Sequence, residues 1–343
     1  MDYLQHTDFE RIKQLLRQPR KILIASHMNP DGDAIGSALA LYGYLTAKGH
    51  TVSVMIPDPD PSFLWWMPFH DKLMVYQREA DRCLEAIRSA ELFFAVDFNT
   101  LGRLSTAEEP LRSSSATRIL IDHHTLPDAA FSLKISYEDI SSTSEIIYDF
   151  IDASGDREMI SREIAECIYA GIVTDTGSFS YSCNHVRTYE ILADLFRRGI
   201  DGEHIHRLIY DNYSEHRMRL LGYSINEKLV VLGEFHAAYI SLTLGELERF
   251  RHQVGDTEDI VNFALSVGGV NLAALFYERE DGIVKVSLRS KGNFAVNGIA
   301  REYFNGGGHV NAAGANSTRS LSETVATFLD LLPRYRDQLK DVY

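Results

Sequence analysis

The sequence predicts an α/β protein, in which a doubly wound, mainly parallel sheet is followed by a smaller α+β domain. Short apolar runs alternate with helical patterns through the first half of the chain. In the last third, strand patterns follow one another closely and indicate local pairing. The 343 residues also exceed the length of one ordinary domain. We therefore expect a first domain in residues 1–185, a helical linker in residues 186–213 and a second domain in residues 214–343.

Four apolar runs of strand length mark the sheet of the first domain. They are residues 21–26, 51–56, 92–96 and 118–121. A run without polar interruption is typical of a parallel strand that is buried on both faces. Between the first two runs, Ile35, Leu39 and Leu45 recur at helical spacing. Ser142 and Glu145 form a capping-box pattern, which predicts that a further helix begins there.

The second domain is expected to mix strands with helices. Residues 230–242 and 271–290 have strand character, and Asp281-Gly282 predicts a hairpin turn inside the second of these segments. Helices are predicted near residues 245–253, 258–267, 297–304 and 321–340. This order of elements is typical of an α+β domain whose strands pair locally.

Composition and charge narrow the classes of partner. With 34 basic and 48 acidic residues the net charge is −14, so the chain should repel long nucleic acid, whereas short nucleotides stay open as substrates. No segment approaches the about 18 apolar residues of a membrane span. The N-terminus lacks an apolar h-region, so we expect no signal peptide, no membrane association and a cytoplasmic location. Cys83, Cys167 and Cys183 lie far apart without a CxxC pair, which predicts reduced, structural thiols.

Four polar clusters interrupt the first domain. They comprise His27, Asp31 and Asp33; Asp97; Asp122, His123 and His124; and Asp175. The first three clusters follow apolar runs, and the carboxyl ends of parallel strands line one common crevice. Asp175 lies beyond a helical stretch and has to fold back into the same crevice. We therefore expect residues far apart in the sequence to converge in one small volume.

Five carboxylates and three imidazoles in one place would repel each other without cations. A mixed set of this kind, without a thiolate, suits divalent ions such as Mn²⁺. Two such ions about 3.5–4 Å apart would activate water and polarise a phosphoryl group. Each residue alone has an ordinary alternative, since Asp97 or Asp175 could be a helix N-cap and Asp31 and Asp33 could be turn residues. Four such coincidences at successive positions are improbable, and the set favours a metal site.

The second domain contains a locally basic stretch. Residues 285–319 contain five basic residues and a single acid, Glu302. Glycines 306–308 can bring backbone N–H groups close to an anion, although a solvated basic face remains the alternative. Asn297 is predicted to be the N-cap of the helix that precedes the glycines, and the glycines are predicted to end that helix. Arg289 can bind a phosphate bidentately, and His309 can donate a hydrogen bond to it.

These motifs together resemble those of the DHH phosphoesterase family. The resemblance rests on His27-x-x-x-Asp31-x-Asp33, on Asp97, on Asp122-His123-His124 and on the late Asp175. Gly306, Gly307, Gly308 and His309 are similar to the GGGH signature of the DHH-associated C-terminal domain, and Arg289 matches the arginine that precedes it. Among two-domain members, the chain looks most like the nanoRNase and pAp phosphatase group.

The resemblance implies a role for each residue. His27 and Asp31 would bind one Mn²⁺, and Asp33, His123 and Asp175 the other, with Asp97 bridging both. His124 would contact the scissile phosphate, and Asp122 would support the neighbouring imidazoles. In the second domain, Arg289, Gly306, Gly307, Gly308 and His309 would bind the substrate, which places the active site in a cleft between the domains. Mg²⁺ or Co²⁺ are expected substitutes for Mn²⁺, and a homodimer is expected by family analogy.

The implied function is a two-metal hydrolase of short oligonucleotides, of the 3′-phosphate of adenosine 3′,5′-bisphosphate (pAp), or of both. A phosphodiesterase of cyclic or linear dinucleotides is the first alternative. A nucleotide-binding regulator without turnover is the second, and it predicts an incomplete set of metal ligands.

Overall fold

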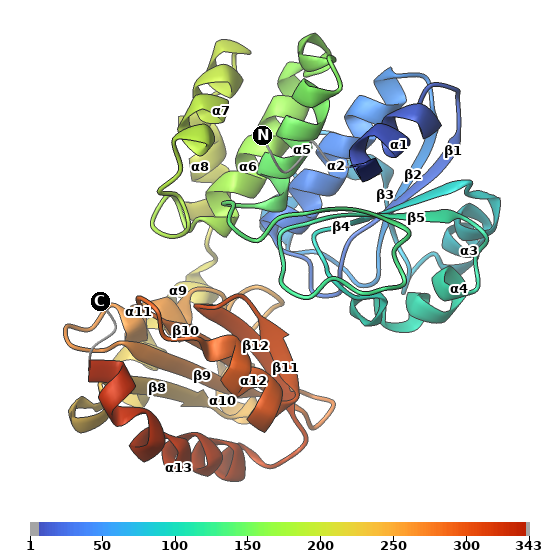
Figure 1. Cartoon of the computed structure of the whole chain (residues 1–343). Helices are drawn as coiled ribbons and strands as arrows, with labels where there is room; N and C mark the ends of the chain where they lie inside the picture. The colour runs from blue at the N-terminus through green and yellow to red at the C-terminus, as the bar shows by residue number, and fades with distance from the viewer. Residues whose placement is uncertain (1–6, 341–343) are drawn as a thin grey trace. The chain divides into compact units, whose positions relative to one another are not determined.

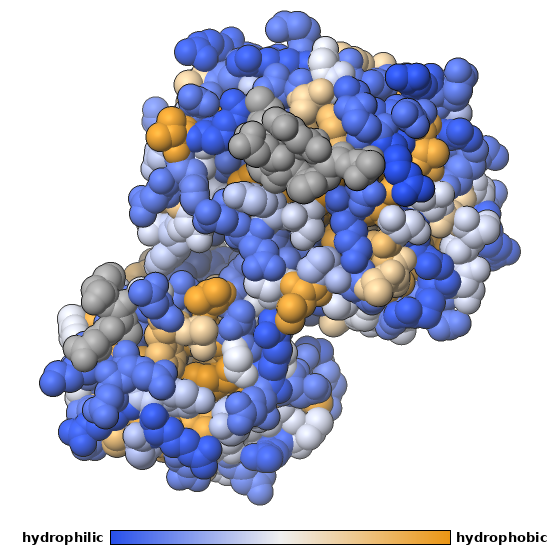
Figure 2. All heavy atoms as spheres, in the orientation of Figure 1, coloured by the Kyte–Doolittle hydropathy of each residue, from blue (hydrophilic) through white to orange (hydrophobic). Residues whose placement is uncertain are grey.

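The structure is a computed structural model that describes residues 7–340, so the first six residues of the polar N-terminus lie outside the described part. The chain divides into two compact units, residues 1–212 and residues 213–343 (Figure 1). Hydrophilic residues cover most of the visible face of each unit in Figure 2, with only small hydrophobic patches between them. None of the helices within residues 7–340 combines the length and the apolar composition that crossing a membrane requires.

A six-stranded parallel sheet forms the centre of the first unit, with strand order β3-β2-β1-β4-β5-β6. The strands are β1 (Lys21–Ala25), β2 (Thr51–Ile56), β3 (Leu73–Val75), β4 (Leu92–Val96), β5 (Thr117–Asp122) and β6 (Leu133–Ser136). The four predicted strands are confirmed and lie side by side in the middle of the sheet. The two strands missing from the prediction, β3 and β6, are short and lie at the edges, where an apolar run is not required.

Helices cover both faces of this sheet (Figure 1). They are α1 (Thr7–Leu15), α2 (Gly32–Ala47), α3 (Ala80–Ser89), α4 (Glu108–Arg112), α5 (Thr143–Ala153), α6 (Arg162–Asp175), α7 (Val186–Arg197) and α8 (Gly202–Tyr210). Ile22 and Ile24 of β1 pack into a core with α2, α5 and α6, whereas Leu23 and Ala25 pack into a second core with α3. Because successive strand residues point to opposite faces, this division confirms the doubly wound α/β fold.

Helices α7 and α8, in the segment expected to link the domains, belong to the first unit. Ile191, Leu195 and Ile205 are buried in the same core as α2 and α6. The three cysteines are buried and free, as expected. The boundary between the units falls after Asn212, and α9 (Glu215–Tyr223) begins the second unit.

The second unit is built on a mixed six-stranded sheet of order β11-β12-β10-β9-β8-β7. Its strands are β7 (Val230–Leu232), β8 (Ala237–Leu242), β9 (Leu272–Glu278), β10 (Val284–Ser290), β11 (Gly306–Gly308) and β12 (Ala312–Ser317). All neighbours are antiparallel except β8 and β9. The hairpin at Asp281-Gly282 is confirmed, since Val284 pairs with Glu278 and Gly282 has φ +76°. This unit confirms the α+β class.

The helices of the second unit are α10 (Leu244–Arg249), α11 (Ile260–Leu265), α12 (Val296–Phe304) and α13 (Leu321–Lys340). Helix α11 packs on one face of the sheet and helices α12 and α13 on the other. The strand character predicted for residues 230–242 is confirmed, but a 3₁₀ turn at Gly233–Phe235 divides the segment into β7 and β8. His236 ends that turn with φ +50°, in the left-handed region and outside the β region of a regular strand.

Candidate metal centre

The predicted residues of the first unit meet at the carboxyl edge of its sheet. His27 lies just beyond β1, Asp97 directly follows β4, and Asp122 ends β5. These three strands are neighbours in the sheet, so their ends face the same crevice. Asp33 lies in the first turn of α2 and Asp175 is the last residue of α6. These two helices pack on each other, so the distant Asp175 reaches the other residues.

His123 and Asp97 lie at the centre of the cluster. Nε2 of His123 is 3.4 Å from Oδ2 of Asp175, 3.5 Å from Oδ1 of Asp97 and 3.9 Å from Oδ2 of Asp33. The other oxygen of Asp97, Oδ2, is 3.4 Å from Nε2 of His27. Asp97 therefore presents one carboxylate oxygen to each of two imidazoles.

The ligand atoms form two groups that fit two divalent cations. His27, Asp31 and Asp97 offer atoms within 4.8 Å of one another, and so do Asp33, His123 and Asp175. The nitrogen–oxygen distances of 3.4–3.9 Å exceed those of an N–H···O hydrogen bond, about 2.7–3.2 Å. Imidazole and carboxylate atoms thus face common points without bonding directly to each other, which is the arrangement that a shared cation requires.

Burial sets the protonation of this cluster when no cation is present. Burial raises the pKa of Asp97 to about 8, and burial together with the charge of Asp97 raises the pKa of Asp33 well above its usual range. Burial also lowers the pKa of His27 and of His123 to about 4. The imidazoles of His27 and His123 are therefore neutral near pH 7, the state in which histidine binds a metal, whereas the carboxylates of Asp33 and Asp97 need positive charge nearby in order to ionise.

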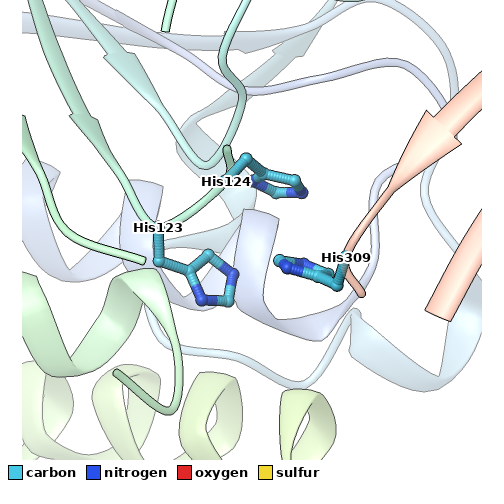
Figure 3. A group of neighbouring side chains, drawn as sticks. All are labelled: His123, His124 and His309. Atoms are coloured by element: carbon cyan, nitrogen blue, oxygen red, sulfur yellow. The ribbon is translucent and has the colours of Figure 1, made fainter. Parts of the chain in front are cut away.

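His124 differs from its neighbour His123. The two imidazoles come from adjacent residues after β5, yet their planes are 81° apart (Figure 3). Burial by itself would lower the pKa of His124, but Nδ1 lies 2.7 Å from Oδ1 of Asp122, and this carboxylate raises the pKa to about 9. His124 is therefore a cation at neutral pH. Its charge outweighs the effect of burial on Asp122 and lowers the pKa of that carboxyl.

The N-terminus of α5 positions two of the carboxylates, which the sequence analysis did not predict. The backbone N–H groups of Thr143 and Ser144 donate to Asp33 at 2.7 and 2.9 Å. The hydroxyl of Thr143 donates to Oδ1 of Asp97 at 2.8 Å. The positive end of a helix dipole suits both anions. In the sequence, the run of small hydroxyl residues before Glu145 is the feature that could have indicated these contacts.

The capping-box prediction at this helix is half correct. Ser142 caps α5 by accepting a hydrogen bond from the N–H of Glu145. The carboxylate of Glu145 does not return to Ser142 but accepts from the hydroxyls of Ser141 and Thr188. The cap thus also anchors α7 to α5.

Glycine at position 171 is required by the close approach of α6 to the site. A Cβ atom at Gly171 would lie 2.7 Å from Oδ1 of Asp33 and would collide with the hydroxyl of Ser144. Gly36 of α2 is similarly constrained, because its Cβ would lie 2.5 Å from the carbonyl oxygen of Cys167. These contacts allow α2 and α6 to approach closely and bring Asp33 and Asp175 together.

Backbone strain is also found at the site. Asp97 has φ +66° and Asn29 has φ +51°, both in the left-handed region that non-glycine residues seldom occupy. The N–H of Asp97 donates to the carbonyl of Ile121 at 3.0 Å, and the N–H of Asn29 donates to both oxygens of Asp58 at 3.0 Å. These hydrogen bonds fix the loops that present the carboxylates and imidazoles.

Arg103 adds a positive charge that the sequence analysis also missed. Its carbonyl accepts from the N–H of Met28 at 2.8 Å, which ties its loop to the residue after His27. Its charge adds to the effect of burial in lowering the pKa of His27, and it opposes the rise in the pKa of His124. Within the part of the chain that the structure describes, the guanidinium makes no hydrogen bond and no ion pair. A positive charge next to the candidate metal ligands suits an anionic ligand.

The glycine run of the second unit differs from the prediction. Helix α12 begins at Val296 and its N-cap is Ala295, so Asn297 is not the cap; its Nδ2 donates to the carbonyl of Gly308 at 3.3 Å. The helix ends at Phe304, and its C-cap is Asn305, with φ +55°, not a glycine.

The three glycines form β11 and pair with β12. A Cβ at Gly308 would lie 2.6 Å from the carbonyl oxygen of Ala312, and one at Gly306 would collide with the carbonyl oxygen of Gly314. Close strand pairing therefore accounts for Gly306 and Gly308. Arg289 of β10 pairs with Ala312 of β12, so it lies two strands from the glycines.

Comparison with known proteins gives a consistent assignment. Residues 21–172 match the DHH family, N-terminal domain, and residues 237–335 match the DHHA1 domain. The bifunctional oligoribonuclease and PAP phosphatase NrnA of Thermus thermophilus is 31% identical over 86% of this chain and 83% of its own length. The cyclic-di-AMP phosphodiesterase GdpP of Geobacillus thermodenitrificans is 26% identical over 89% of this chain and 46% of its own length.

Among solved structures, an exopolyphosphatase-related protein from Bacteroides fragilis is 38% identical. The superposition has a TM-score of 0.92 and covers 97% of this chain and 98% of that one. The similarity thus extends over nearly the whole length of both chains.

Proposed function

This chain belongs to the DHH family and is a phosphoesterase, and from that premise we propose that it cleaves short oligonucleotides and the 3′-phosphate of pAp. The observation that supports this proposal most directly is the pair of ligand groups around Asp97, which presents one oxygen to each group. The similarity to an oligoribonuclease and PAP phosphatase supports the choice of substrate.

Two Mn²⁺ ions are the proposed cofactors. His27, Asp31 and Asp97 would hold one, and Asp33, His123 and Asp175 would hold the other together with Asp97. When bound, the ions would polarise a phosphoryl oxygen, activate water for attack and offset the negative charge of the reacting phosphate. Imidazole and carboxylate donors without a thiolate favour Mn²⁺, with Mg²⁺ or Co²⁺ as substitutes.

Positively charged groups of the protein itself would also act on the phosphate. We propose that the Nε2–H group of His124 donates a hydrogen bond to a phosphoryl oxygen. Asp122 binds Nδ1 of the same ring and keeps the imidazole protonated. Arg103 would supply a second positive charge. Thr143 would keep Asp97 oriented through its hydroxyl.

In the second unit, Arg289 and His309 are proposed to bind a phosphate of the substrate. Gly306, Gly307 and Gly308 remain candidates through their backbone, because β11 is the edge strand of its sheet. The backbone groups on the outer side of an edge strand have no strand partner. The anion would therefore bind to the backbone along the free edge of β11, and not to a glycine turn as the sequence predicted.

The test is a product analysis with Mn²⁺ on di- to pentanucleotides labelled at the 5′ or 3′ end, with pAp in parallel. We expect mononucleotides from the oligonucleotides, and AMP with inorganic phosphate from pAp. Omission of Mn²⁺ and the Asp97→Asn variant are the controls. A protein that binds Mn²⁺ and releases neither product contradicts the proposal.

A second candidate is hydrolysis of cyclic or linear dinucleotides, which the 26% identity to a cyclic-di-AMP phosphodiesterase supports. Cyclic di-AMP and its linear product in the same assay separate the two candidates by their kcat/KM. A regulator without turnover requires an incomplete ligand set, and all six predicted ligands are present. We also propose a cytoplasmic location and a homodimer, and light scattering of the purified protein tests the latter.

A further inference from the structure

A cavity lies in the first unit, beside the edge strand β3. Its volume is about 320 Å³, at the lower end of the range for small-molecule sites. Trp65, His70 and Arg78 line it together with Asp60 and with two aliphatic residues of β3, Leu73 and Val75. None of these residues belongs to the metal centre.

The cavity is close to the metal centre along the sheet. Asp60 follows β2, and Arg78 follows β3, so part of the lining comes from the carboxyl edge where His27 also lies. Strand β3 is two strands from β1, a separation of about 10 Å. Asp58, in the same loop as Asp60, accepts the N–H of Asn29 in the metal-binding loop. A short oligonucleotide is long enough to reach both places.

The walls of the cavity suit a flat aromatic ligand. Trp65 is 56% exposed, unusually high for a residue of its size. Its ring centroid is 6.4 Å from that of His70, with the planes tilted by 37°. Nε2 of His70 lies 2.8 Å from Oδ2 of Asp60, so the imidazole is held in place. Bases stack on such side chains irrespective of sequence.

The charges of the lining favour a base over a phosphate. Asp60 and Glu79 oppose the single Arg78 of the lining, and Asp58 is a further carboxylate in the loop that contains Asp60. A phosphate would be repelled by these carboxylates. The exocyclic amino group of adenine, cytosine or guanine can instead donate a hydrogen bond to one of them.

We propose that this cavity binds a nucleobase of the substrate, stacked on Trp65, at a nucleotide removed from the scissile phosphate. The proposal rests on the proposed function for its substrate class. It predicts that substrates of three or more nucleotides use the cavity, whereas a small phosphodiester without a base does not.

Kinetics of Trp65→Ala give the first test. We expect KM for a pentanucleotide to rise about tenfold with kcat within twofold, because one stacked base contributes about 1–3 kcal/mol. Hydrolysis of bis(p-nitrophenyl) phosphate should not change. Phe196→Ala removes another exposed aromatic of the same unit, 48% exposed on α7, and should leave both reactions unchanged. Equal pentanucleotide KM values for Trp65→Ala and wild type would overturn the proposal.

Fluorescence tests the cavity without any turnover. The chain has two tryptophans, so Trp66→Phe leaves Trp65 as the only reporter. Adenosine and cytidine, which contain no phosphate ester, should quench its emission saturably, and ribose 5-phosphate should not. Absence of quenching, or equal quenching by ribose 5-phosphate, overturns the proposal even if hydrolysis is normal. Saturable quenching in a protein that hydrolyses no nucleotide would instead refute the proposed function and leave the cavity assignment standing.

Discussion

Short motifs predicted two binding sites, the candidate metal site of the first unit and the glycine run of the second. The structure supports the first prediction more strongly than the second. In the first unit, the predicted side chains converge and their ligand atoms lie within 4.8 Å of one another in each group. In the second, two of the three glycines are explained by the pairing of β11 with β12. Carboxylates and imidazoles at the ends of parallel strands predict both a site and its place in the fold. A glycine predicts only that another group packs close to the backbone, and it does not say whether that group is a ligand or a neighbouring strand.

The largest expected effect tests the shared ligand of the first unit. Asp97→Ala removes the carboxylate that faces both ligand groups, so we expect kcat to fall thousandfold or more, about 4 kcal/mol of barrier. Calorimetric titration should show loss of at least one of two Mn²⁺ sites. Circular dichroism serves as the folding control. Activity within tenfold of wild type would end the assignment of Asp97.

Removal of the metal should distinguish the two units. Mn²⁺ at a hundred times its Kd stabilises its binding site by about 2.7 kcal/mol, and only the first unit contains the predicted ligands. Chelation with EDTA should therefore lower the melting temperature of the first unit and leave that of the second unchanged. Hydrogen exchange followed by peptide mass analysis, with and without EDTA, measures the protection of the backbone amides of both units in one sample. Equal loss of protection in both units would contradict this separation.

The two arginines should affect different kinetic constants. Arg103 lies beside the proposed metal ligands, so Arg103→Ala should lower kcat ten- to hundredfold while Mn²⁺ binds as tightly as before or more tightly. Arg289→Ala should raise KM more than it lowers kcat, if it binds ground and transition states alike. Steady-state kinetics with a Mn²⁺ titration measure both. Weaker Mn²⁺ binding in Arg103→Ala would show that Arg103 supports the fold of the site.

The glycine run can be tested by a matched pair. Gly306→Ala places a Cβ against the carbonyl oxygen of Gly314, which should cost about 1–3 kcal/mol of stability. Gly307→Ala meets only Nε of Arg301, at 3.9 Å, and should be tolerated. Urea unfolding followed by circular dichroism compares them. If all three glycines formed an anion-binding turn, the two variants would instead lose substrate affinity equally.

The smallest expected effect concerns acid stability far from the site. Tyr148, Arg157 and Arg198 donate to Asp194 and lower its pKa to about 2, despite the opposing effect of burial. Because the folded pKa lies below the unfolded value, this contribution is present above about pH 4 and is lost as the pH falls toward 2. Asp194→Asn should remove about 1–2 kcal/mol at pH 7.

The same variant should flatten the dependence of stability on pH between 5 and 2. Glu246 of the second unit has a pKa of about 2 as well, so the second unit should keep its own acid dependence. Unfolding by urea at several pH values measures this. An unchanged slope for the first unit would contradict the role of Asp194.

Much of the fold followed from local patterns. Uninterrupted apolar runs predicted β1, β2, β4 and β5, because a strand covered on both faces admits no polar residue. The edge strands β3 and β6, and the break after Leu232, escaped prediction because exposed backbone is compatible with many sequences. Polar residues at the ends of apolar runs likewise pointed to the crevice at the carboxyl edge.

The sequence by itself determined which groups could bind cations, since the side-chain chemistry of His27, Asp97 and His123 needs no coordinates to be read. Only the tertiary structure decided how they are oriented. The N–H groups of Thr143 and Ser144, the space left by Gly171 and the charge of Arg103 come from segments that no local pattern connects to the ligands. Orientation depends on packing between distant elements, and packing is a property of the folded chain as a whole.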